Sequence, residues 1–398
     1  MGNGLGESAC VHLGGQKWLI VDSMIDRPGD PPAALAYLDA FEYEDGLAAH
    51  VVGMVVTHWH DDHTRGFHQL NVALPDVPLW IPAALDPYQF LTRVRAVIET
   101  DNGTAGSDDA TAAKPRPDGP VDDTPEQDGE APAGLQGLYA LLSRERKGHG
   151  PLSLPDLGHA SSGKHIAGWT SSPGLPECRV TALSPSDAAT DDMRLRFSEW
   201  LAKRLAVGEP SGLPHVEQNH LSVALHVQVG NVHVLLGSDL ERRPGRMGWE
   251  GVVKDLTRDF HPVSLFKIAH HGSRTAHDER LIPAPTKLLT DRTHGMLTPF
   301  RQGISAVPSA DETATLASGL TSVWTTSPDP RYEKTPDSVR VLNALTARGF
   351  APKTKTRDFG MLRARLAVDP GPGQDWDIQP FGAAARLSPG SRAATHGG

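Results

Sequence analysis

The segment VVGMVVTHWHDDHTRGF, residues 51–67, constrains the fold of this chain more than any other feature. An apolar run typical of a buried strand leads directly into His58, His60, Asp62 and His63. In extended backbone, side chains at i and i+2 point to the same side, so His58 and His60 are expected to face one point. Asp62 and His63 begin the next turn and should face a neighbouring point. Because zinc and related cations prefer imidazole nitrogen and carboxylate oxygen, the pattern predicts a metal site at a strand end.

Three further segments place metal-ligand residue types next to an apolar strand. The strand in VHVLLGSD ends at Asp239, and the strand in LFKIAHH ends at His270 and His271. His220 stands just ahead of the strand in QNHLSVALHV. Each has a structural explanation when taken alone, because an aspartate can cap a helix and a histidine can be a paired core residue. Together they predict a single site, since an α/β fold gathers its site at strand ends.

Short apolar runs alternate with helical patterns, which predicts a layered α/β sandwich. Residues 227–234, VQVGNVHV, are predicted to form a hairpin, because Gly-Asn between two alternating runs suits a two-residue turn. The other expected strands are 9–13, 17–22, 51–57, 77–81, 178–183, 222–229, 232–236, 265–269, 296–299 and 322–325. The expected helices are 32–41, 88–99, 192–206, 248–256, 311–318 and 338–348.

Length and composition limit the class of protein. The 398 residues suffice for two or three domains, or for one elaborated domain. The sequence is 22% charged and lacks the uncharged run of about 18 residues that crosses a bilayer, so we expect no contact with membranes. The first residues lack the pattern of a secretory signal, and two cysteines cannot form a disulfide framework. We therefore expect a cytoplasmic protein.

The net charge of −10 is spread unevenly. Residues 101–130 hold nine acidic and two basic residues, a balance of −7, which leaves −3 for the rest of the chain. This argues against a surface that coats nucleic acid by bulk attraction, although a local cleft for an anionic substrate remains compatible with it. The stretch 101–133 is rich in Pro, Gly, Asp, Ala and Thr, and it has almost no large apolar residues. It therefore cannot bury enough surface to fold.

We expect one catalytic domain interrupted by an insertion. Its first half is residues 1–100, a disordered insertion with a short helix spans 101–176, the second half is 177–387, and a disordered tail covers 388–398. The acidic insertion could dock or regulate a partner, but a plain solvated loop is the simpler interpretation.

The ordered set HxHxDH, His, Asp and His, each beside a strand, resembles the metallo-β-lactamase fold superfamily. More narrowly, it is similar to the branch typified by the hydrolase domain of the competence protein ComEC. That branch opens with a Gly-rich, acid-containing strand, here GNGLGESACVHLGGQKWLIVDS. It also carries NxxS, Gly-x-Asp and HHGS motifs, which stand here at 219–222, 237–239 and 270–273. The resemblance covers about residues 4–100 and 178–326.

The resemblance implies a four-layer αβ/βα sandwich with two divalent cations, Zn²⁺ or Mn²⁺. It implies three groups of ligands: His58, His60 and His220 for one cation, Asp62, His63 and one of His270 or His271 for the other, and Asp239 as the bridge. The branch often has Asn in place of His220, so the third ligand of the first cation stays open. Strand-end geometry favours His270 over His271.

Two other features of the branch bear on the site. It tends to place a His-Pro near Val307-Pro308, where this chain reads SAVPSADE and so lacks that histidine. Asp22 closes a predicted strand and could orient a ligand imidazole from outside the ligand set, as such partners fix tautomer and ring angle. Asn219, beside His220, is a second residue expected in that outer position.

Two cations about 3.5–4 Å apart can share a water and lower its pKa toward neutrality, so solvent is the expected nucleophile. No Ser-His-Asp arrangement or reactive Cys is then required. The expected catalytic carboxylates are Asp239, which bridges, and Asp62 or Asp61, which would pass protons. Asp61 is otherwise a loop-shaping residue.

The substrate follows from the resemblance. Zinc-dependent lactamases commonly use Cys at the position of Asp239, whereas phosphoester hydrolases typically carry Asp, and competence-type relatives imply nucleic acid. We therefore predict a phosphodiesterase or nuclease with a nucleic acid or nucleotide substrate. Arg65, Lys267, Ser273 and Arg274 are candidates to hold phosphate, although each also fits an ordinary surface or strand residue.

Stand-alone members of this branch resemble hydrolase subunits of bacterial antiviral gene clusters, which implies a role in defence and protein partners in a defence complex. One alternative is a metallo-hydrolase of an ester, a thioester or a phosphorylcholine-type substrate. A second alternative is a non-catalytic component of such an assembly, whose metals only stabilise the fold.

Overall fold

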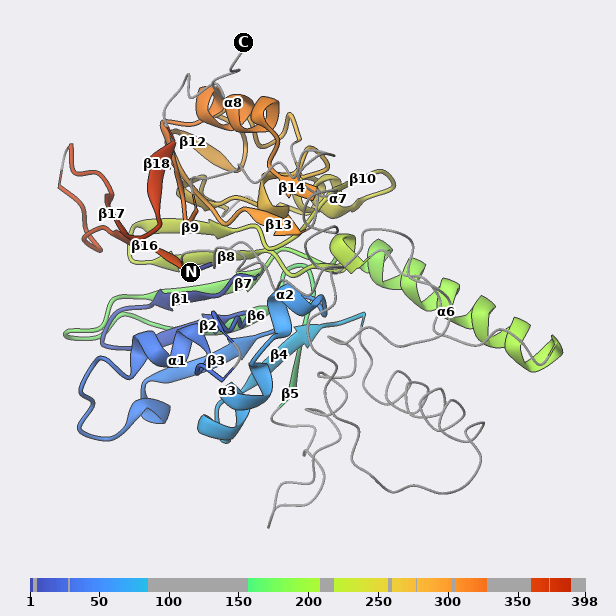
Figure 1. The fold of residues 1–398 in the computed structure, drawn as a ribbon, viewed down its shortest axis with the longest axis horizontal. Helices are drawn as coiled ribbons and strands as arrows, with labels where there is room; N and C mark the ends of the chain where they lie inside the picture. Colours follow the sequence, from blue (N-terminus) through green and yellow to red (C-terminus); the bar gives the residue numbers. More distant parts are fainter. Residues whose placement is uncertain are drawn as a thin grey trace, which may run out of the picture.

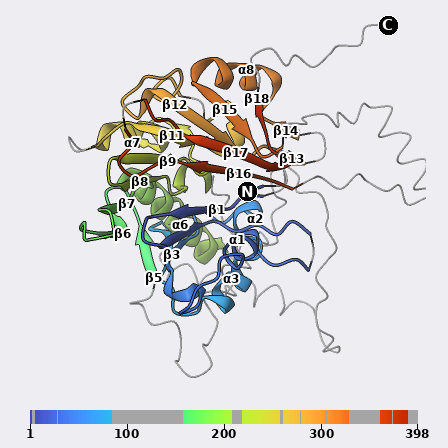
Figure 2. The same cartoon turned by 90° about the vertical axis from the view of Figure 1, so that its left-hand side faces the viewer.

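A computed structural model of the chain describes residues 1–2, 6–27, 29–84, 157–207, 218–256, 260–276, 278–302, 305–327, 359–371 and 373–387. Two β-sheets face each other at its centre (Figures 1 and 2). The expected helices 88–99 and 338–348, most of the predicted insertion and the tail 388–398 lie outside these ranges. No helix in the described ranges is long and apolar enough to span a bilayer.

The first sheet has five strands in sequence order. They are β1 (Ala9–His12), β2 (Trp18–Val21), β3 (Val51–Val55), β4 (Leu79–Pro82) and β5 (Leu157–Ala160). The pair β1 and β2 is antiparallel, and the remaining pairs are parallel. The ends of β2 and β3 therefore lie at the same edge of the sheet.

The second sheet has eight strands. In spatial order they are β18 (Ala385–Leu387), β15 (Ser322–Thr325), β12 (Leu289–Leu297), β11 (Val263–Lys267), β9 (Val232–Leu236), β8 (Leu225–Val229), β7 (Cys178–Ala182) and β6 (His165–Trp169). Strands β9 and β11 are parallel neighbours, so their ends also meet at one edge. Shorter ribbons pair β13 (Phe300–Gln302) with β14 (Ser305–Val307) and β16 (Gly360–Arg365) with β17 (Asp377–Gly382), and β10 is Arg242–Arg243.

Helices flank the two sheets, most of them on the outer faces (Figure 1). They are α1 (Ala33–Leu38), α2 (Asp61–Thr64), α3 (Phe67–Ala73), α6 (Asp187–Val207), α7 (Gly248–Asp255) and α8 (Ala310–Gly319), with short 3₁₀ turns η1 (Leu47–Ala49), η3 (Gln218–Leu221) and η4 (His270–Gly272). Helix α8 starts where the sequence dictates, because Ser309 and Glu312 form a reciprocal capping box. Helix α6 extends away from the sandwich.

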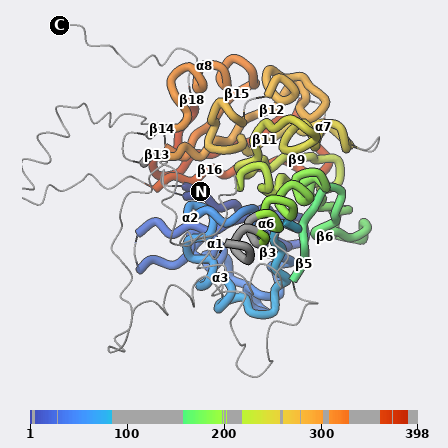
Figure 3. The backbone as a smooth tube through the Cα atoms, turned by 90° about the vertical axis from the view of Figure 1, so that its right-hand side faces the viewer, coloured from blue at the N-terminus to red at the C-terminus, as the bar shows by residue number. Residues whose placement is uncertain are grey.

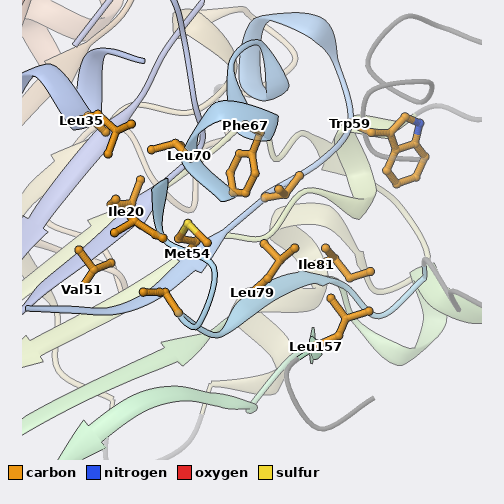
Figure 4. Packing of buried hydrophobic residues seen from close by; sticks show 14 of the residues in the cluster. Ile20, Leu35, Val51, Met54, Trp59, Phe67, Leu70, Leu79, Ile81 and Leu157 are labelled. Carbon is orange, nitrogen blue, oxygen red and sulfur yellow. The ribbon is translucent and has the colours of Figure 1, made fainter. Parts of the chain in front are cut away.

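The outermost layer on the first sheet is held by apolar packing. Leu35 of α1 and Phe67 and Leu70 of α3 are buried against Ile20 and Met54 of the sheet (Figure 4). Burying a side chain of this size contributes roughly 1.5–3 kcal/mol. This packing fixes the first sheet to its helices.

Two more apolar layers complete the sandwich. Between the sheets, Val21 and Val55 pack in one cluster with Val180 and Leu225. On the outer face of the second sheet, α7 and α8 contribute to a separate cluster in which Trp249 is fully buried. The predicted four-layer αβ/βα sandwich is therefore confirmed, and Figure 3 shows its layers along the chain trace.

The predicted hairpin at 227–234 is confirmed, because β8 and β9 pair antiparallel with Val229 opposite Val232 across Gly230. The predicted end of the insertion at residue 176 is wrong. Strand β5 joins the first sheet and β6 joins the second, so residues 157–169 belong to the sandwich. The short segments LGHA and HIAGW lack a clear alternation of apolar residues, and their partners in the sheets stabilise them as strands.

Candidate metal centre

Side chains from four strand ends converge at the edge of the two sheets. Among the described residues, three sets of possible ligand atoms each lie within 4.8 Å of one another, and two of these sets share Asp239. The first ligand group is His58, His60 and Asp239, and the second ligand group is Asp62, His63, Asp239 and His271. Asp239 belongs to both, so the two groups are adjacent.

The first ligand group comes from the loop after β3 and the loop after β9. His58 Nε2 lies 3.0 Å from His60 Nδ1 and 3.8 Å from Asp239 Oδ2. His58 and Asp239 are buried, at 0% and 2% exposure. Two imidazole nitrogens and one carboxylate therefore face a common, water-poor point.

The second ligand group adds α2 and the end of β11. His63 Nε2 lies 3.2 Å from Asp239 Oδ1 and 3.5 Å from Asp62 Oδ2. His271 Nε2 lies 3.0 Å from Asp62 Oδ2 and 3.5 Å from Asp239 Oδ2. Asp62 sits in the first turn of α2, where the helix dipole favours a carboxylate.

Outer hydrogen bonds aim both imidazoles of the second ligand group. His63 Nδ1 donates to Asp22 Oδ2 at 2.7 Å, and His271 Nδ1 donates to the carbonyl oxygen of Thr298 at 2.9 Å. In the neutral form that can bind a cation, each ring therefore presents the lone pair of its Nε2 toward the carboxylates. The structure places Asp22 where an orienting carboxylate was expected.

Asp22 also reaches His58 through Thr57. The Thr57 hydroxyl donates to Asp22 Oδ2 at 2.7 Å and lies 3.1 Å from His58 Nδ1, from which it accepts. The Thr57 backbone N–H donates to Asp22 Oδ1 at 2.8 Å. One buried carboxylate thus orients one imidazole in each ligand group.

The donor set fits divalent cations. With their Nδ1 protons committed elsewhere, the neutral rings place Nε2 lone pairs against carboxylate oxygens, which also carry lone pairs. His63 Nε2 and Asp239 Oδ1 are buried and make no hydrogen bond within the part of the chain that the structure describes. Buried acceptors that face each other need protons or cations between them. The nitrogen and oxygen ligands suit zinc or manganese.

The same geometry shifts the pKa values of these groups. Burial lowers the pKa of His271, but Asp239 and Asp62 outweigh burial and raise that pKa to about 9. Burial likewise opposes protonation of His63, yet Asp239, Asp62 and Asp22 raise its pKa well above the usual value. Burial raises the pKa of Asp239, but His63 and His271 bring it well below its usual range. In the metal-free protein, the protonated imidazoles of His63 and His271 thus offset the repulsion between the carboxylates of Asp62 and Asp239.

These pKa shifts predict that a rise in pH lowers the stability of the metal-free protein but strengthens the binding of metal. Between pH 6.5 and about 9 the folded metal-free protein binds more protons at His63 and His271 than the unfolded chain, so these groups stabilise it less as pH rises. A bound cation displaces those protons and binds more tightly at high pH. We expect the Tm difference between metal-loaded and metal-free protein to widen by several degrees from pH 6.5 to pH 9 in thermal melts. A constant or narrowing difference would contradict the assignment, since groups elsewhere affect both forms alike.

Strained backbone shapes the strand ends. Among the described non-glycine residues, six have positive φ, and four of them are at this site: Asp22, Ser238, His270 and His271. At Gly237 an added Cβ would lie 2.9 Å from the carbonyl oxygen of Lys267, so only glycine lets β9 and β11 end so close together. This approach brings Asp239 beside His271.

The preference for His270 over His271 is reversed by the geometry. His271 is buried in the second ligand group, whereas His270 turns away. His270 Nδ1 lies 2.8 Å from Glu241 Oε1, and its Nε2 lies 3.2 Å from Asn219 Nδ2. Strand-end geometry misled the prediction because both histidines adopt a positive φ, which changes the alternation of side chains.

The remaining predicted ligand lies outside both ligand groups. His220 is buried, and its Nε2 is 4.0 Å from Asp192 Oδ2. The first ligand group therefore consists of three residues and does not include His220. Asn219 lies near the centre, where its Nδ2 contacts His270 and Glu241 Oε1, the latter at 3.3 Å.

The predicted phosphate-binding residues divide into two kinds. Lys267 is not free, because its Nζ lies 2.7 Å from Glu7 Oε2 in a largely buried ion pair. Arg65 and Arg274 are exposed, and the Ser273 hydroxyl lies 2.7 Å from that of Thr275. Asp61, also predicted to be catalytic, is half-buried in the first turn of α2 and in neither ligand group.

Sequence reasoning missed three residues around the site: Glu7, Thr57 and Glu241. Glu7 forms a third set of close atoms with Asp22 and His63. Because His63 Nδ1 already donates to Asp22 and Glu7 pairs with Lys267, this set surrounds the second ligand group rather than forming a further one. The acid within the Gly-rich opening strand was a signal for Glu7, but nothing in the spacing pointed to Thr57 or Glu241.

Comparisons with known proteins add little to this geometry. No family model matches the chain, and no curated protein matches it. Among solved structures, it is similar to the crystal structure of Zn²⁺-bound PqqB from Methylobacterium extorquens, with 11% sequence identity and a TM-score of 0.28. The match covers 65% of this chain and 58% of that chain, which is less than two thirds of PqqB. A likeness at this level says nothing about activity.

Proposed function

We propose that this protein is a divalent-metal-dependent hydrolase that cleaves phosphodiester bonds in a nucleic acid or nucleotide. The observation that carries the proposal is Asp239, whose Oδ2 lies 3.8 Å from His58 Nε2 and 3.5 Å from His271 Nε2, and whose Oδ1 lies 3.2 Å from His63 Nε2. A shared carboxylate between two sets of inward-facing lone pairs is the arrangement that holds two cations close together.

The residues of the chain have separate tasks in this proposal. His58, His60 and Asp239 would hold one cation, and Asp62, His63, Asp239 and His271 the other. When bound, such a pair supplies a water of lowered pKa and polarises the phosphoryl oxygen. Asp22 keeps the imidazoles aimed inward, and Asp62, whose side chain is 14% exposed, would accept a proton.

The choice of phosphodiester rests on the ligand chemistry. Both ligand groups contain carboxylate oxygen and imidazole nitrogen only, and the two cysteines lie on strands β1 and β7 rather than in either group. This hard donor set suits Mn²⁺ as well as Zn²⁺, and both are used to neutralise anionic esters. The similarity of the sequence motifs to the ComEC-like branch supports nucleic acid in particular.

The test is a substrate panel with metal-loaded protein. We expect release of p-nitrophenol from bis-p-nitrophenyl phosphate and cleavage of labelled single- or double-stranded DNA or RNA, with no turnover of nitrocefin or thioesters. Turnover of a thioester, lactam or phosphorylcholine ester alone would instead establish a different hydrolase. If no substrate is turned over while Asp62→Ala lowers only the Tm and spares biological function, the metals are structural. We further propose protein partners in an antiviral assembly, which gene neighbourhood and co-purification test.

A further inference from the structure

A buried ion pair lies directly behind the second ligand group. Glu7, near the start of the chain, is 5% exposed, and its Oε2 lies 2.7 Å from Lys267 Nζ. Lys267 ends β11, and its Nζ also donates to the carbonyl oxygen of Ile268 at 3.0 Å. The pair therefore connects two segments that are far apart in sequence, immediately before the turn that presents His271.

The Glu7 carboxylate faces the outer edges of both imidazoles. Its Oε1 lies 3.9 Å from His63 Nδ1, and its Oε2 lies 3.7 Å from His271 Nδ1. These separations exceed hydrogen-bond length, and both Nδ1 protons are committed to Asp22 and Thr298. The carboxylate thus sits between the rings without taking the proton of either one.

The backbone around Glu7 is fixed to the same site. Its N–H donates to the carbonyl oxygen of Asp62 at 2.9 Å, and the Ser8 hydroxyl donates to the carbonyl oxygen of Asp22 at 2.9 Å. At Gly6 an added Cβ would approach that Asp62 oxygen to 2.9 Å, so the close passage requires glycine. The segment is consequently held against both the ligand loop and its orienting carboxylate.

We infer that Glu7 and Lys267 are a positioning pair for the second cation, an inference that rests on the metal centre of the proposed function. The ion pair lies on the Nδ1 side of the two imidazoles and keeps His63 and His271 at their separation. Because Lys267 neutralises the carboxylate, Glu7 does not compete with the acceptors that orient the two rings. An unpaired carboxylate at the same place would draw on both Nδ1 protons, since an uncompensated buried charge takes any donor within reach.

The experiment measures metal binding rather than turnover. Glu7→Gln keeps the shape of the side chain but leaves the Lys267 ammonium buried and unpaired near the second cation. We expect affinity for the second Co²⁺ or Zn²⁺ to fall about 10–100-fold, as for other residues that support metal ligands, while the first cation binds as in the wild type. Chelator competition, followed by the visible absorption of Co²⁺, resolves the two events.

Two further variants separate positioning from stability. Glu7→Gln combined with Lys267→Met removes both charges, so we expect recovery of the Tm lost in the single variant. The second site should stay weak, because the ion pair that holds the two imidazoles in position is still missing. If Glu7→Gln alone fails to fold, the double variant is used to measure the affinity of the second site. Asp278→Asn is the matched control, because Asp278 is a buried carboxylate paired with Arg280 at 2.6 Å and in neither ligand group. It should lower the Tm and leave both affinities unchanged.

Each outcome decides the matter. Wild-type affinity for both cations in Glu7→Gln and in the double variant would overturn the positioning role. Equal weakening by Asp278→Asn would also overturn it, because general destabilisation would then explain the effect. Failure of the wild-type protein itself to bind a second cation would instead reject the metal centre, and with it the proposed function.

Discussion

Replacing Asp239 by Asn should remove both cations and abolish hydrolysis. Asp239 is the residue shared by the two ligand groups, with Oδ2 3.8 Å from His58 Nε2 of the first group and Oδ1 3.2 Å from His63 Nε2 of the second. An amide has one oxygen and no charge, so it cannot serve both sides. Cations at such a site stabilise the transition state by several kcal/mol, so the rate should fall by about 10³-fold or more. Metal content by mass spectrometry and phosphodiester turnover check the two expectations.

Asp278→Asn again provides the control for this change. It removes a buried charge of the same kind at a position outside both ligand groups, so it should keep two cations per chain and a near-normal rate. Retention of two tightly bound cations in Asp239→Asn would contradict the shared-ligand assignment, however strongly the rate fell.

Replacing His271 by Ala should cost the protein one cation, whereas the same change at His270 should not. His271 Nε2 faces Asp62 and Asp239, at 3.0 and 3.5 Å. His270 is instead tied to Glu241. With a ligand of the second group missing, the catalytic pair cannot assemble, and we expect a loss of about 10²-fold or more in the rate.

The pair of variants is informative because the two residues are adjacent in sequence. Titration with Zn²⁺ should give one tight equivalent for His271→Ala and two for His270→Ala. The reverse result would restore His270 as the ligand and would mean that the turn after β11 rearranges when metal binds.

Local pattern predicted the strands that carry the site. Apolar runs ending at Asp22, at His58 and before Asp239 are strong signals, because a buried strand needs such a run and its end needs a polar residue. The observed strands β2, β3 and β9 end within a few residues of those positions. Parallel pairing of β2 with β3, and of β9 with β11, then places these ends at shared edges.

Contacts between distant segments could not be predicted in the same way. The positive φ of His270 and His271 depends on how β9 and β11 approach each other at Gly237, which no local pattern reveals. The role of Glu7 depends equally on Lys267, which is remote in sequence. The sequence therefore predicts which residue types surround the centre better than which individual atoms face it.

Anomalous diffraction from crystals grown with Zn²⁺ or Mn²⁺ tests the metal centre most directly. Data collected at the absorption edge of the metal should show two peaks about 3.5–4 Å apart on either side of Asp239, one contacting His58 and His60 and the other Asp62, His63 and His271. A map without a peak at Asp239, or with peaks only at other residues, would contradict the account.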